Sequence, residues 1–241
     1  SIYGFDQFLN ISNNAIKSSL IKHLSMEPSC AQPVDSPPWM DIAWFEYLLW
    51  RENNWTINDP QGQKRAQNYI HITSNYFKPF QAGWCGCFVD WVLKKTNQIY
   101  GTTFSTVMNN PSGSQNYATR KRYPGSIRIR PRLNQIPYGS LVVLQSGLWQ
   151  GHVGFLVNYT KIGHERYAYL LAGNQNDKVC VQEFQVYRVS NKIFYQTRKG
   201  KTFILKGFVF PQEYQWENQK DKAFEYCDEG YEIVEAFREL P

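Results

Sequence analysis

The sequence predicts an α+β fold in which helices come first and strands follow. Three segments with apolar residues at helical spacing stand at 39–50, 64–77 and 85–96. From Ser140 onward the apolar residues alternate as they do in strands. The loops between the early strands are short, which favours antiparallel neighbours. Helices followed by a run of strands are typical of the α+β class, here with helices packed on an antiparallel sheet.

The predicted helices each have a local reason. The helix at 39–50 follows prolines, which fit the first helical turn because the N–H they lack would have no partner there. The inward faces expected of the next two helices are Ala66, Tyr69, Ile70 and Phe77, and then Phe88, Val89, Val92 and Leu93.

Five strands are predicted, at 141–144, 153–157, 167–171, 179–187 and 203–210. The segment 101–140 between helices and strands is rich in Gly, Ser, Asn and Pro and is interpreted as a long irregular excursion. It carries the basic residues Arg120, Lys121, Arg122, Arg128, Arg130 and Arg132. A solvated loop face and a contact for an anionic polymer both remain open for this cluster.

The chain divides into an N-terminal extension at 1–37, a main domain at 38–211 and an acidic, helical C-terminal tail at 212–241. The net charge is +6, but residues 213–241 hold nine acidic and three basic groups, so the rest of the chain is strongly basic. A basic body suits a polyanionic partner such as cell-wall polymer, nucleic acid or a membrane surface. No nucleic-acid-binding motif accompanies the basic residues, so nucleic acid is disfavoured.

No run approaches the ~20 apolar residues that a membrane span needs. No signal peptide is visible, and the polar N-terminus opens on Ser. The cysteines number five, so at least one is free or pairs with another chain, while four could form disulfides or simply be buried.

Cys85 is the candidate nucleophile. It stands between Gly83 and Gly86, where a substrate can approach closely, and directly before the third helical pattern. A helix N-terminus lowers the pKa of a thiol, so a thiolate is expected. Cys87 is the competitor, but on a helix it faces away from Cys85. A zinc site that uses both is disfavoured because Cys-x-Cys lacks a second ligand pair at the usual spacing.

His152 and Asn174 complete a nucleophile–base–orienter series. His152 stands between two glycines at the start of a strand and can act as the base. Asn174 ends the next apolar run, and adjacent antiparallel strands would bring it close to His152. Asn174 is also typical of a turn, and Gln175 and Asp177 are the alternatives for the orienter.

These segments resemble the NlpC/P60 and CHAP group of cysteine peptidases, especially a bacterial and phage subgroup of cell-wall hydrolases. The matching segments are Pro38-Trp39-Met40, Ala43 with Glu46, Trp84-Cys85 with Phe88-Val89, Pro137 to Val143, Gly151 to Phe155, and Gly173-Asn174-Gln175. The resemblance covers roughly residues 37–210. Ala172 replaces a family glycine, and the spacing after Glu46 is shifted, so no catalytic role is assigned to Glu46.

The resemblance implies a papain-like NlpC/P60 fold, with the nucleophile helix packed on an antiparallel sheet. It implies hydrolysis of an amide in peptidoglycan stem peptides, with Cys85, His152 and Asn174 catalytic and the backbone N–H of Cys85 donating to the oxyanion. Substrate contacts are expected at Trp84, Gly151 and Gln175, and no metal or organic cofactor is expected.

The expected protein is therefore an antibacterial effector toxin resembling type VI secretion amidase effectors. It would be secreted without a visible signal peptide and would act in the periplasm or cell wall of a target bacterium. An immunity protein that blocks the cleft is the expected partner. The alternatives are a phage lysis endopeptidase, a Cys–His acyltransferase or deamidase acting on lipid or protein, and a non-catalytic binding module.

Overall fold

The computed structural model describes residues 37–73, 83–107, 110–129, 136–148 and 150–214. Three helices come first: α3 (Pro38–Glu52), α4 (Pro60–Thr73) and α5 (Cys85–Tyr100). A short 3-10 helix, η1 (Ser114–Ala118), leads into the strands. The strands are β1 (Ser126–Ile129), β2 (Leu141–Gln145), β3 (Gly151–Ile162), β4 (Glu165–Gln175), β5 (Lys178–Val189), β6 (Lys192–Thr197) and β7 (Thr202–Pro211). The three helices and five of these strands lie where the sequence predicts them.

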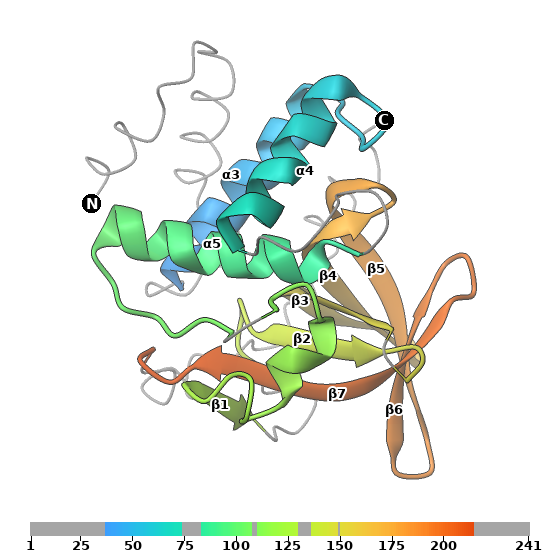
Figure 1. Ribbon diagram of the computed structural model, residues 1–241. Coiled ribbons are helices and arrows are strands. Elements are labelled where there is room, and N and C mark those ends of the chain that lie inside the picture. The colour runs from blue at the N-terminus through green and yellow to red at the C-terminus, as the bar shows by residue number, and fades with distance from the viewer. Residues whose placement is uncertain (1–36, 74–82, 108–109, 130–135, 149, 215–241) are drawn as a thin grey trace.

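The strands form a closed antiparallel barrel. The pairing runs β2–β3–β4–β5–β6–β7, and β7 pairs back with β2, while β1 pairs with the C-terminal end of β7, on the same edge as β6. The three helices lie together at one side of the barrel (Figure 1), and α5 packs against β3 and β4. Closure gives each of the six barrel strands a hydrogen-bonded neighbour on both sides over at least part of its length.

The predicted fold class is therefore wrong. The papain-like α+β arrangement calls for an open antiparallel sheet packed with helices, whereas these strands close into a six-stranded barrel accompanied by three short helices. The physical reason is β6, for which no strand is predicted. It pairs with β5 from Phe184↔Thr197 to Val189↔Lys192, and with β7 from Phe194↔Ile204 to Gln196↔Thr202. The backbone pairing of this one strand closes the sheet.

The core is continuous from the helices into the barrel and is rich in aromatic side chains. Trp39 is fully buried in α3 and donates from Nε1 to the carbonyl oxygen of Gly139, 3.0 Å away. Its ring also packs on Tyr214, with centroids 4.9 Å apart. The start of α3 is thus held to the entrance of β2 and to the segment after β7.

Several expectations fall partly or wholly on residues outside the described ranges. These include nearly all of the extension 1–37 and of the tail 212–241, together with Cys30 and Cys227. In the excursion 101–140, Arg120, Lys121 and Arg122 are exposed. Cys85, Cys87 and Cys180 are buried. None of the helices described here is long and apolar enough to cross a membrane.

Candidate active site

One rim of the barrel gathers three strand connections. Neighbouring strands are antiparallel all the way round, so the β2–β3, β4–β5 and β6–β7 turns lie at the same rim. His152 stands at the start of β3, Gln175 ends β4, and Lys201 immediately precedes β7. Residues far apart in the sequence therefore meet at this rim, which the N-terminus of α5 also reaches.

Cys85 is the first residue of α5 and is 3 % exposed. The backbone N–H of Val153, the residue after His152 on β3, is close enough to the thiol to lower its pKa. The backbone N–H groups of Cys85 and Gly86 also face the sulfur. Cys87 lies in the same helical turn, is also buried and has further contacts within the described structure. The start of α5 thus lies near β3, the strand that carries His152.

His152 is 7 % exposed and its ring is held by Gln175. The Nε2 atom of His152 lies 3.0 Å from Oε1 of Gln175. The amide nitrogen of Gln175 donates to the carbonyl oxygens of Leu170 (3.0 Å) and Cys180 (2.6 Å). Because both donor directions of the amide are used on carbonyls, its oxygen faces the ring and accepts the hydrogen bond from Nε2. Nδ1 therefore keeps the lone pair and is the atom that can take a proton.

Asn174 does not occupy the orienter position expected from the sequence. Its backbone is left-handed, with φ of 57°, and its side-chain amide nitrogen lies 3.2 Å from where a Cβ on Gly83 would stand. The side chain thus lies beside the loop that enters α5, while the next residue, Gln175, holds His152. The register of β4 against β5 shifts between Ala172 and Gln175, and strand alternation fails across that irregularity.

Burial sets the protonation states of the pair. It raises the pKa of the Cys85 thiol, and the surrounding N–H groups and Lys201 only partly oppose that rise. Burial also lowers the pKa of His152 to about 4, against a smaller opposite effect of Gln175. Both shifts favour the uncharged forms of the thiol and of the imidazole. The thiolate expected from the helix N-terminus is disfavoured because desolvation outweighs the effect of the helix end.

Trp84 lies in the core, not at an open surface. It is 2 % exposed, and its ring stacks on Trp50 and Tyr69 with centroids 5.6 and 5.7 Å away. A Cβ on Gly173 would stand 2.4 Å from the Trp84 ring. The expected substrate contact at Trp84 is thus a packing contact, and it fixes the residue directly before the nucleophile.

Gly151 has a similar packing explanation. A Cβ at this position would lie 2.1 Å from Nε2 of Gln115 and 2.9 Å from Oγ of Ser114, both in η1. Gln115 itself donates to the carbonyl oxygen of Leu144, 2.7 Å away. Glycine is required here because η1 packs directly on the entrance of the strand that carries His152.

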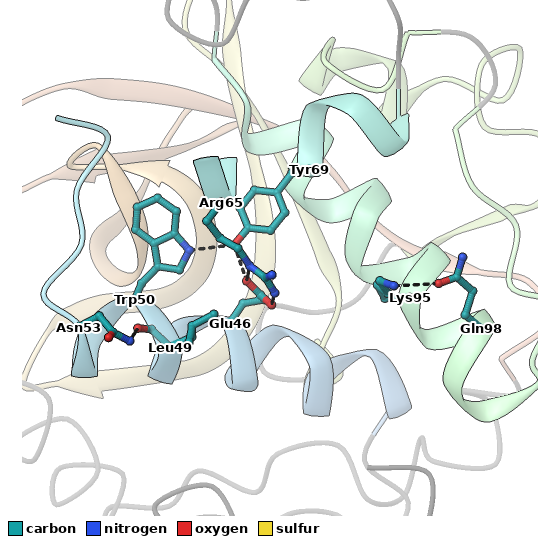
Figure 2. A network of polar contacts seen from close by, with 8 residues as sticks. All are labelled: Glu46, Leu49, Trp50, Asn53, Arg65, Tyr69, Lys95 and Gln98. Atoms are coloured by element: carbon teal, nitrogen blue, oxygen red, sulfur yellow. Dashed lines mark hydrogen bonds and ion pairs between the residues drawn. The ribbon is translucent and has the colours of Figure 1, made fainter. Parts of the chain in front are cut away.

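A buried polar network joins α3 and α4 (Figure 2). Glu46 is fully buried and accepts from Nε of Arg65, 2.9 Å away, and from the hydroxyl of Tyr69. Trp50 in turn donates to that hydroxyl at 2.8 Å. Tyr69 and Trp50 also stack on Trp84, the residue before α5. Packed side chains therefore connect the Glu46–Arg65 ion pair between α3 and α4 to the start of α5.

Within the described ranges, no group of three or more His, Cys, Asp or Glu side chains is arranged to hold a metal ion. Comparison of the chain with protein families, with curated proteins and with solved structures gives no match.

Proposed function

We propose that this protein is a thiol-dependent amidase in which Cys85 is the nucleophile, His152 the base and Gln175 the orienting residue. The observation that carries the proposal is the fully used amide of Gln175, which gives His152 one tautomer on the strand next to the start of α5. This arrangement has the nucleophile, base and orienting group of thiol catalysis.

The proposed reaction begins as the proton of the Cys85 thiol passes to Nδ1 of His152. The sulfur then attacks the amide carbonyl carbon. The backbone N–H of Cys85 is the proposed donor that stabilises the oxyanion. When the C–N bond breaks, His152 returns the proton to the leaving amine, and a thioester remains. Water attacks the thioester, gives one proton to His152 and releases the acid, and that proton restores the thiol.

Peptidoglycan is the proposed substrate. The support is the ordered set of motifs around Cys85 and His152, which resembles the cell-wall hydrolases of the NlpC/P60 and CHAP group. Delivery into a target bacterium as an antibacterial effector, with an immunity protein as partner, belongs to the same proposal. Lysis endopeptidase activity of phage type is the alternative that uses the same chemistry.

The test is digestion of purified peptidoglycan by the wild type, Cys85→Ala and Cys87→Ala, with the products identified by mass spectrometry. We expect new stem-peptide products from the wild type and from Cys87→Ala, and none from Cys85→Ala. No new products from the wild type would reject the wall substrate. Equal activity of Cys85→Ala and the wild type would reject Cys85 as the nucleophile.

A further inference from the structure

The third hairpin of the site rim, between β6 and β7, holds a lysine in a fixed place. The backbone N–H of Thr197 donates to the carbonyl oxygen of Lys201, 2.9 Å away. The N–H of Lys201 donates back to Oγ1 of Thr197 at 3.1 Å. Gly200 takes the left-handed conformation that this turn requires, with φ of 81°. These two hydrogen bonds close the turn, so the backbone of Lys201 has a defined position at the rim.

The ammonium of Lys201 lies close to the catalytic pair. Its Nζ is 5.1 Å from the centroid of the Phe203 ring, and the centroid of that ring is 6.4 Å from that of His152. The positive charge also reaches both catalytic groups, since it lowers the pKa of the Cys85 thiol and of His152. The Phe203 ring thus lies between the ammonium and His152, and the charge of Lys201 acts on both Cys85 and His152.

This cation has no carboxylate to neutralise it among the residues that the structure describes. Arg198 in the same hairpin differs, because its Nε lies 3.0 Å from Oε1 of Glu183. Lys201 is exposed, whereas Cys85 and His152 are buried. An exposed and uncompensated ammonium at the rim that holds Cys85 and His152 suits an anionic group on the incoming substrate.

We propose that Lys201 binds a carboxylate of the substrate next to the amide that Cys85 attacks. The inference rests on the proposed function, since it takes Cys85 as the nucleophile, and it adds a substrate class: peptides with a free carboxylate close to the scissile bond. Lys201 is a specificity residue in this account. An amidated or neutral peptide leaves the Lys201 charge unpaired and gains no binding energy from it.

The test uses two small alkylating reagents of similar shape, iodoacetate and iodoacetamide. In both cases the sulfur of Cys85 displaces iodide, but only iodoacetate carries a carboxylate. Rates are measured on Cys85 by peptide mass spectrometry, and the ratio of the two rates is compared among variants. Any effect of Lys201 on thiolate formation cancels in this ratio, because both reagents use the same thiolate.

We expect Lys201→Gln to lower the iodoacetate-to-iodoacetamide ratio by about fivefold, the upper range for one exposed charge pair. Lys201→Arg should preserve the ratio. The matched control is Arg198→Gln, which removes a charge from the same hairpin and should leave the ratio unchanged. An unchanged ratio in Lys201→Gln, or an equal fall in Arg198→Gln, would overturn the proposal.

The two proposals fail in different ways. An unchanged ratio on a reactive Cys85 rejects the role of Lys201 and leaves the amidase proposal intact. A ratio that depends on Lys201 without any peptidoglycan product rejects the wall substrate and keeps the carboxylate site. If neither reagent modifies Cys85 in the folded protein, the access that both proposals require is absent, and both are rejected.

Discussion

Asp90 offers a stability prediction whose size follows from the structure. Its side chain is fully buried in α5, the helix that begins with Cys85. Nζ of Lys94 lies 2.7 Å from Oδ2, while Oδ1 has no hydrogen-bond partner among the described residues. Burial raises the pKa of Asp90 from 3.8 to about 6, although the contact with Lys94 lowers it. The folded state therefore holds a proton that the unfolded state has already released.

The sign of the pH dependence follows from this rise. Below pH 3.8 Asp90 is protonated in both the folded and the unfolded state, so its charge does not lower the free energy of unfolding. As the pH rises from 3.8 to about 6, the folded protein must give up a proton that it binds more tightly than the unfolded chain. Near 1.4 kcal/mol per pKa unit, this amounts to about 3 kcal/mol of stability lost by pH 7.5.

Asp90→Asn removes the titration and keeps the shape. Urea unfolding of both proteins between pH 4 and pH 8 gives the difference in their free energies of unfolding. We expect this difference to move in favour of the variant by about 2.5 kcal/mol, because Asp90 of the unfolded chain is already partly ionised at pH 4. Any effect of the amide that does not depend on pH drops out of that change. The titration of all other groups also cancels, because both proteins contain them. A difference that stays flat with pH would refute the reasoning.

Three further predictions concern the site and its support. The His152 imidazole should titrate near pH 4 in a side-chain NMR titration, and a midpoint near 6.5 would contradict its burial. Because the pKa is lowered in the folded state, the stability linked to this group is present above pH 6.5 and is lost as the pH falls toward 4. Gly173→Ala should cost about 1–3 kcal/mol in denaturant unfolding and reduce activity, because its Cβ would stand 2.4 Å from the Trp84 ring. Gly207→Ala is its control, with nothing within 4 Å of the new Cβ, and equal losses in the two variants would exclude the packing explanation. Glu46→Gln should cost roughly 3 kcal/mol in the same assay, because it leaves a largely buried guanidinium without its carboxylate, and a neutral result would show that the pair is dispensable.

The helices could be predicted from sequence because their causes are local. Prolines begin α3, and helical spacing of apolar residues marks α5. The closure of the barrel has no such local cause. β6 is short, and its role depends on backbone pairing with β5 on one side and β7 on the other. The periodicity of a single strand does not indicate which strands it pairs with, so the sequence predicts an open sheet.

The candidate site was partly predictable for the same reason. Cys85 and His152 stand at the starts of elements, where sequence signals are strong. The choice between Asn174 and Gln175 depended on register at the end of β4. Asn176 and Asp177 both have positive φ, 48° and 62°, as the central residues of a two-residue hairpin do. Those two residue types were the sequence signal that could have identified Gln175 as the last strand residue.

The most direct test of the central claim compares Gln175→Ala with Asn174→Ala in cleavage of the peptide bond identified from the peptidoglycan digest. We expect Gln175→Ala to lower kcat by about 100-fold, because the imidazole loses the hydrogen bond that fixes Nδ1 as the base. Asn174→Ala should retain most of its activity, since Gln175 supplies the hydrogen bond to the imidazole and the Asn174 amide lies beside Gly83. Loss of activity in Asn174→Ala with normal turnover in Gln175→Ala would contradict the assignment.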